Sequence, residues 1–175
     1  RVFDQAERHG LVDPDGRLFW SFGADCVRSE SATPVTEREA YYKDLPAPDG
    51  PMARFYSRRS GAAHGYYEQK RNYRQFDFGG VNLMRKYGAD WEKAWISVAH
   101  DRLRSWGLNT VANWSDAAVC AARRTPYTAN ASFSSKLIEG SEGYWGKFPD
   151  PYDPSFAEGI RGAMEKQKAA GAVGD

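Results

Sequence analysis

The sequence predicts an α/β protein built around a parallel sheet. Short apolar runs of strand character alternate along the chain with segments whose apolar residues recur at helical spacing. The clearest unit is residues 91–113, where an amphipathic segment, one glycine and a short apolar run follow one another. Strands that alternate with helices are typical of a sheet whose parallel strands are connected by those helices.

A β-hairpin opens the predicted fold. The turn residues Asp13-Pro14-Asp15-Gly16 separate Leu11-Val12 from the aromatic run 17–23. This run continues through residue 27, so we expect a nearly continuous, buried parallel strand with polar Asp25 near its end. The carboxyl end of such a strand lies where ligands bind in α/β proteins.

Residues 29–80 differ from the rest of the chain, because Pro, Gly and Ser recur there and the periodicity is poor. A loop of this length in a compact domain is usually functional or disordered. Its aromatic residues argue against disorder. We therefore expect an ordered excursion over one face of the domain, with one short helix over residues 36–44 that Thr36 caps.

The most regular segment is a predicted helix over residues 91–106, which Asp90 caps and Gly107 ends. One face carries apolar residues at four-residue spacing, widened by two more: Trp91, Trp95, Ala99 and Leu103, with Ile96 and Trp106. His100 is expected at the surface or only partly packed. A short strand over residues 108–113 follows, so that the chain forms a β–α–β unit.

The remaining predicted elements are a small helix near residues 116–122, a strand over 125–128 and a helix over about 154–170. Asp153 is the natural N-cap of the last helix and Pro154 suits its first turn. Phe156, Ile160 and Met164 share one face of it.

Composition excludes several classes of function. With 24 basic and 23 acidic residues the net charge is +1, which gives no indication of nucleic-acid binding. No apolar run approaches the ~20 residues of a membrane span, and no GxGxxG or phosphate loop occurs. We expect no cofactor and no metal site. Cys26 and Cys120 are expected as buried thiols, with a disulfide between them left open.

Polar and aromatic side chains follow the three predicted parallel strands. Asn and Asp can bond to sugar hydroxyls, while Trp and Tyr can stack on the apolar faces of sugars. The aromatic content of 14% includes pairs in polar, loop-like sequence such as Tyr66-Tyr67 and Tyr144-Trp145. The alternative for residues 113–116 is a strand exit followed by a helix cap, and the two interpretations are compatible. The candidate substrate-binding residues are Asp25, Asn113, Trp114, Asp116 and Tyr127.

The segment RLRSWGLNTVANWSD, residues 102–116, resembles the second βα unit of β-agarase-like enzymes of glycoside hydrolase family 50. Other segments resemble this family in the same order. They are LVDPDGRLFWSFGADCV as entry hairpin and first strand, VNLMRKYGADWEKAW as the lead-in to the second strand, and RTPYTA and FPDPYDPSFAEGI as the third strand and next helix. The resemblance covers most of the chain from Gly10, with residues 46–65 matching least.

The resemblance implies a (β/α)8 TIM barrel that hydrolyses β-linked galactose-type polysaccharide with retention. Such enzymes use two glutamates, after the fourth and seventh strands, with carboxyls about 5–5.5 Å apart. A closed barrel typically needs about 250 residues. We therefore expect one domain over residues 1–175, holding roughly the first three βα units, the hairpin and the excursion, and stopping at Gly174-Asp175 before either glutamate.

The expected partner is a polysaccharide or oligosaccharide, and the resemblance implies a secreted or periplasmic protein. Two alternatives stay open. The first is a complete small α/β domain that binds carbohydrate or a partner without catalysis. The second is a self-contained hydrolase in which Asp25 and Asp116, at adjacent strand ends, serve as acid and nucleophile. The oligomeric state and the identity of the polysaccharide stay open as well.

Overall fold

A computed structural model describes residues 2–5, 8–62 and 64–172, and the expected chain end at Gly174-Asp175 lies outside these residues. The elements along the described chain are β1 (Val2–Gln5), β2 (Arg8–Val12), β3 (Leu18–Phe19), β4 (Gly23–Ala24), β5 (Ala32–Pro34), the 3-10 helices η1 (Glu39–Tyr41) and η2 (Ala53–Phe55), β6 (Tyr56–Arg59), β7 (Tyr73–Asp77), α1 (Phe78–Tyr87), α2 (Trp91–Ser105), β8 (Thr110–Val111), α3 (Ala117–Ala121) and α4 (Pro154–Ala169).

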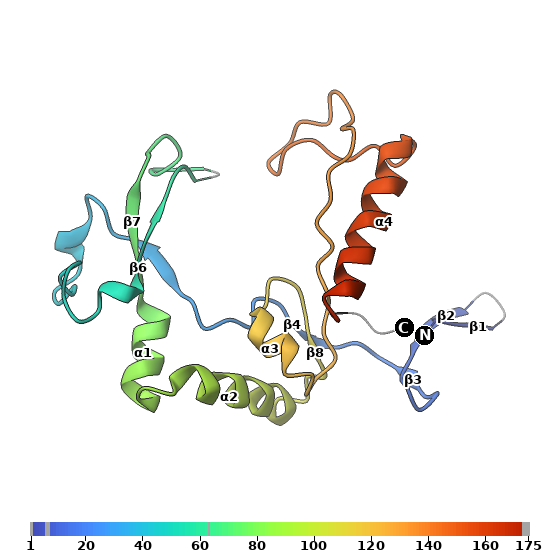
Figure 1. The fold of residues 1–175 in the computed structure, drawn as a ribbon, viewed down its shortest axis with the longest axis horizontal. Helices are drawn as coiled ribbons and strands as arrows, with labels where there is room; N and C mark the ends of the chain where they lie inside the picture. Colours follow the sequence, from blue (N-terminus) through green and yellow to red (C-terminus); the bar gives the residue numbers. More distant parts are fainter. Residues whose placement is uncertain (1, 6–7, 63, 173–175) are drawn as a thin grey trace.

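Parallel pairing between β4 and β8 lies at the centre of the molecule (Figure 1). Gly23 pairs with Thr110 and Ala24 pairs with Val111. On its other side Val111 forms a parallel bridge with Tyr127, so the expected strand over residues 125–128 is reduced to one bridge. The predicted α/β class with parallel strands is confirmed, and the three strands stand side by side in chain order.

The predicted hairpin is also confirmed, because β2 and β3 pair antiparallel with Leu11 opposite Phe19. In its turn, the Asp13 N–H donates to the Arg17 carbonyl and the Gly16 N–H donates to the Asp13 carbonyl. The Asp13 carboxylate also accepts the Arg17 N–H at 2.8 Å. Gly16 takes the left-handed φ of 83° that the turn requires.

The expected single buried strand after this turn is wrong. Asn109 interrupts it, because its side-chain oxygen accepts the Phe22 N–H and its side-chain nitrogen donates to the Trp20 carbonyl, both at 2.8 Å. These amide bonds take the place of a strand ladder between β3 and β4. The described part of the chain also leaves the apolar side chains of the run in solvent, with Trp20 84% exposed. Cys26, expected to be buried, is exposed as well.

Residues 29–80 contain a three-stranded antiparallel sheet in the order β5-β7-β6, where the sequence predicted no strands. The expected helix over residues 36–44 is wrong except for the single turn η1. Glu37 takes a left-handed φ of 62°, which ends any helical run there. Thr36 is not a helix cap, since its hydroxyl accepts the Arg74 N–H at 2.7 Å beside β7.

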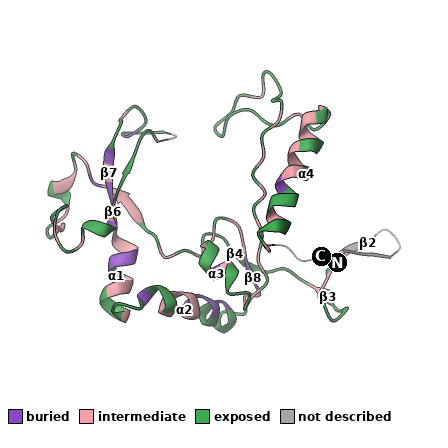
Figure 2. Cartoon of the chain, in the orientation of Figure 1, coloured by how far each residue is buried: buried purple, intermediate pink, exposed green. Residues whose placement is uncertain are grey.

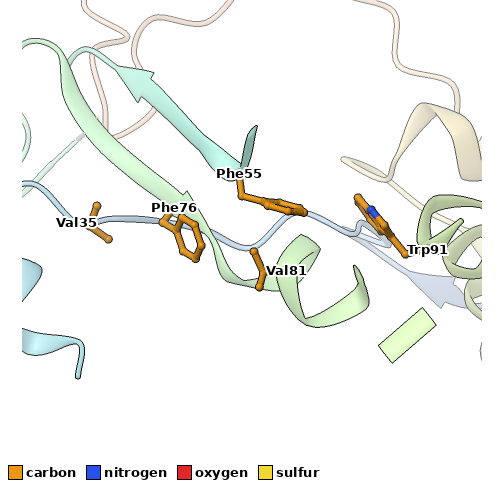
Figure 3. Close-up of a cluster of buried hydrophobic side chains, with 5 residues drawn as sticks. All are labelled: Val35, Phe55, Phe76, Val81 and Trp91. Atoms are coloured by element: carbon orange, nitrogen blue, oxygen red, sulfur yellow. The ribbon is translucent and has the colours of Figure 1, made fainter. Parts of the chain in front are cut away.

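One hydrophobic cluster joins this sheet to the helices that follow it. Figure 3 shows its five buried side chains, which come from the segment after β5, from η2 and from β7, α1 and α2: Val35, Phe55, Phe76, Val81 and Trp91. The Phe55 and Trp91 rings lie 6.3 Å apart, so the first residue of α2 closes the cluster. Asp77 caps α1 by accepting the Gly80 N–H at 3.0 Å.

A second cluster lies at the other end of α2 and consists of Ala99, Leu103, Val111 and Val119. It packs α2 against β8 and α3, as the predicted apolar face of the helix requires. Trp106 does not share that face, because it ends the helix and is 66% exposed. Asp90 stands at the N-cap position, but its side chain makes no capping bond.

His100 is fully buried, which corrects its expected place at the surface or in partial packing. Its Nε2 lies 3.1 Å from the Val119 carbonyl and its Nδ1 lies 2.8 Å from the Thr125 hydroxyl. A carbonyl only accepts, so Nε2 carries the proton, and the neutral Nδ1 accepts from Thr125. The imidazole thereby ties α2 to both α3 and the third strand.

The last helix, α4, begins as predicted, because the Asp153 side chain accepts the Ser155 N–H at 3.0 Å. Phe156 and Ile160 of the predicted face are half-buried, and Phe156 packs edge to face on Phe133. Met164 departs from the prediction, since it is 45% exposed while its neighbour Ala163 is buried. Figure 2 shows the buried residues gathered on β7, α1 and α2, with α4 largely exposed. The accessible surface is 12881 Å², against about 8,600 Å² expected for a compact monomer of this mass.

We predict that acid weakens the fold through His100. Burial lowers the pKa of His100 in the folded protein. As the pH falls below the pKa of about 6.5 that histidine has in an unfolded chain, the unfolded state therefore binds a proton that the folded state does not bind. The free energy of unfolding should therefore decrease from pH 7.5 to pH 5.5, measured by urea denaturation. His100→Gln should be less stable at pH 7.5 and should show a smaller loss on acidification. An equal loss in both proteins would contradict the prediction.

Candidate functional site

The segments that leave β4 and β8 run side by side and are joined by a continuous set of backbone bonds. Ala112 donates to the Ala24 carbonyl at 2.9 Å, Cys26 donates to Asn113 at 2.8 Å, and Asp116 donates to Val27 at 2.9 Å. The pairing of two very short strands therefore extends well beyond the strands themselves. We call residues 25–29 and 112–116 together the paired rim.

Two side chains, those of Asp25 and Ser115, bond to backbone groups within the paired rim. Asp25 accepts the Asn113 N–H at 2.8 Å. The Ser115 hydroxyl accepts the Val27 N–H at 3.0 Å and donates to the Ala112 carbonyl at 2.8 Å. The sequence pattern gave Ser115 no role, although a hydroxyl at a strand exit is well suited to bond to backbone.

The Asp116 side chain connects the paired rim to α2. Its Oδ2 accepts the Ser29 N–H at 2.7 Å and the Trp95 indole N–H at 3.1 Å. The carboxylate therefore joins both segments of the rim to α2. It makes no capping bond to α3, although it stands at the N-cap position of that helix.

Two residues of the paired rim, Cys26 and Trp114, take left-handed backbone conformations with φ of 54° and 56°. Such a conformation costs a residue with a Cβ roughly 1–2 kcal/mol, and it persists only where the surroundings enforce it. The bonds across the rim provide that constraint. Its effect is to hold Trp114 with its side chain 63% exposed at the carboxyl end of β8.

Asn113 is half-buried beside Trp114, and its Oδ1 accepts the Trp114 N–H at 3.1 Å. Among the described residues, its Nδ2 has no protein partner. Of the five predicted site residues, the structure brings four together in the paired rim. These are Asp25, Asn113, Trp114 and Asp116.

Tyr127 lies apart from this group. Its backbone bridges to Val111, but its hydroxyl donates to the Ala172 carbonyl just beyond α4. It lines a cavity of about 620 Å³ between α3, the segment after Tyr127 and the end of α4, which Ser115 and Cys120 also line. Burial raises the pKa of the Cys120 thiol, so this thiol is held neutral.

The described residues contain no group of three or more His, Cys, Asp or Glu side chains placed to hold a metal ion. Within the same residues, no helix is both long and apolar enough to cross a membrane. The side chains of the paired rim include the exposed indole of Trp114, the Asn113 amide, two carboxylates and the exposed Cys26 thiol.

We predict that Asp116 contributes more to stability than an exposed aspartate. Asp116→Ala leaves the Ser29 N–H and the Trp95 indole N–H without their acceptor, which should lower the free energy of unfolding by about 1–3 kcal/mol. Asp49→Ala is the matched control, because Asp49 is exposed and such a change usually shifts stability by less than about 0.5 kcal/mol. Equal urea midpoints for the two variants would refute the assignment.

Comparison with known proteins shows that the chain is similar in sequence to β-agarases. It is 30% identical to β-agarase B of Vibrio sp. (strain JT0107) over 180 residues, which cover 89% of this chain and 18% of that protein. It is 29% identical to β-agarase A of the same strain over 164 residues, covering 84% of this chain and 15% of that protein. The chain thus spans less than a fifth of the length of these relatives.

Solved structures agree with the sequence comparison. The fold superposes on the crystal structure of the agarase AgWH50C with a TM-score of 0.75 at 26% identity, covering 97% of this chain and 27% of that one. A scan against models of protein families found no match. The chain is therefore agarase-like, related in sequence and fold over most of its length to one portion of the β-agarases of glycoside hydrolase family 50.

Proposed function

We propose that this chain forms the first three βα units of a glycoside hydrolase barrel that acts on β-linked galactose-type polysaccharide such as agarose. The observation that supports this most directly is the paired rim. It holds an exposed tryptophan and an amide at the carboxyl ends of parallel strands, in a chain that is similar to β-agarases. Ligands of (β/α) barrels bind at that end of the strands.

The barrel is favoured over a complete small binding domain by the surface that the chain leaves exposed. The accessible surface area of the chain, 12881 Å², is about half as large again as that expected for a compact monomer of this size. The strands β4, β8 and the Tyr127 bridge stand in chain order, as consecutive strands of a barrel do. Further βα units would cover both edges of this sheet.

In this proposal the predicted site residues take three roles, which their contacts support. Asn113 offers its amide Nδ2 to a sugar hydroxyl, while its Oδ1 accepts the Trp114 N–H. The exposed indole of Trp114 suits an apolar sugar face. Asp25 and Asp116 hold the rim that presents them, because their carboxylates accept backbone or indole donors. Tyr127, whose hydroxyl donates to the Ala172 carbonyl just beyond α4, lines the cavity beside the paired rim.

Retaining hydrolysis needs one carboxyl that donates a proton and another that attacks the anomeric carbon, about 5–5.5 Å apart. In this proposal neither group belongs to the chain. Asp25 and Asp116 are poor candidates because the fold already uses them as acceptors. The contribution of this chain is substrate binding and orientation, and bond cleavage falls to glutamates supplied by later strands of the barrel.

We predict that the purified chain releases no product from agarose or from an aryl β-galactoside, because in this proposal the carboxyl pair belongs to later strands of the barrel. Product would be measured as reducing ends and as released chromophore. Asp25→Asn and Asp116→Asn serve as the decisive variants. Turnover by the chain that either variant abolishes would overturn the proposal and favour a self-contained hydrolase.

We predict that Trp114→Ala weakens saccharide binding more than it weakens the fold. The indole is 63% exposed, so its removal exposes little core, whereas loss of an aromatic contact to ligand should raise the dissociation constant roughly three- to tenfold. Binding would be measured by affinity electrophoresis in agarose-type polysaccharide and stability by thermal melting. Trp106→Ala is the control, a tryptophan exposed to a similar 66% at the end of α2. A large loss of stability without loss of binding would make Trp114 a packing residue.

A further inference from the structure

A second aromatic feature lies far along the chain from the paired rim, in the segment between the third strand and α4. Its two arms form an antiparallel bridge between Leu137 and Pro149. Ile138 donates to the Phe148 carbonyl and Asp150 donates to Lys136, both at 2.9 Å. The segment is therefore an ordered hairpin-like loop.

The tip of this loop is a tight turn of four residues, Gly143-Tyr144-Trp145-Gly146. Gly146 donates to the Gly143 carbonyl at 3.0 Å and takes a φ of 89°, which a residue with a side chain rarely adopts. Just outside the turn, Lys147 and Glu142 form an ion pair at 2.9 Å. The turn thus fixes the backbone of two adjacent aromatic residues, and the flanking charges neutralise each other.

The two rings at this tip are exposed yet held in place. Trp145 is 85% exposed and Tyr144 is 65% exposed. Tyr144 packs against His64 in a tilted arrangement, with ring centroids 4.1 Å apart and an angle of 30° between the ring planes. Trp145 meets Tyr144 edge to face, at 4.8 Å and 81°. His64 belongs to the 29–80 excursion, so the tip is braced by a segment some 80 residues earlier in the chain.

An indole held at the tip of an ordered turn and left in solvent contributes almost nothing to the hydrophobic core. Such an exposed indole suits a flat, weakly polar surface such as the C–H face of a sugar ring. The self-neutralised surroundings favour an uncharged ligand over a phosphate or an acidic chain. A polysaccharide offers many identical units, so one chain can engage two separated aromatic contacts.

We propose that Trp145, braced by Tyr144 and His64, is a second sugar-binding subsite for a neutral polysaccharide, separate from the paired rim. The inference rests on the proposed function, because it takes the polysaccharide class from it. Trp145 supplies the stacking surface. Tyr144 and His64 are positioning residues that fix the orientation of the indole.

The test is affinity electrophoresis of the whole chain in native gels that contain increasing amounts of soluble agarose-type polysaccharide. Trp145→Ala should raise the dissociation constant roughly three- to tenfold. His64→Ala should raise it by a smaller factor, because the indole remains but loses its brace. Trp20→Ala is the matched control, since that tryptophan is 84% exposed on the N-terminal hairpin and should leave the constant unchanged.

The outcomes separate this inference from the proposed function. If Trp114→Ala weakens binding while Trp145→Ala matches Trp20→Ala, the second subsite is overturned and the proposed function stands. If the unmodified chain is not retarded at all, both are overturned. Sedimentation of the chain and of Trp145→Ala tests the remaining alternative, that the loop tip contacts a second copy of the chain. A dimer that Trp145→Ala converts to monomer would show that the tip contacts a second copy, which also overturns the subsite.

Discussion

Helix α2 is the support on which both halves of the structure depend. Trp91 at its start completes the cluster under the β5-β7-β6 sheet. Near its end, Ala99 and Leu103 pack against β8 and α3. Between the two clusters, the Trp95 indole N–H reaches Asp116 in the paired rim. One amphipathic helix thereby packs against both the sheet of the excursion and the parallel strands, and through Trp95 it also contacts the paired rim.

The paired rim illustrates how a small fold stabilises an unfavourable local conformation. Cys26 and Trp114 are both left-handed, and neither is glycine. Backbone bonds between the two segments, together with Asp25 and Ser115, hold this geometry and leave the indole of Trp114 outside the core. In the proposed site the carboxylates act on the ligand indirectly, through the shape of the backbone that presents the aromatic and amide groups.

Exposed aromatic residues are the common property of the rim and of the 143–146 turn. The chain buries few apolar side chains for its length, and its accessible surface is about half as large again as compactness predicts. In the proposed enzyme, further barrel strands would cover the edges of the parallel sheet that the described residues leave unpaired. Trp114 and Trp145 are exposed aromatic residues that specific contacts hold in place.

Sequence alone determined the features that depend on neighbouring residues: the Asp13–Gly16 turn, the apolar face of α2 and the Asp153 cap of α4. It also placed Asp25, Asn113, Trp114 and Asp116 at adjacent strand ends, since parallel strands bring their carboxyl ends together. Only the tertiary structure decided burial and partnership. It buried His100, exposed Trp20 and Cys26, and turned the glycine- and proline-rich excursion into a sheet. The reason is that these outcomes depend on contacts between residues distant in sequence, which local periodicity does not record.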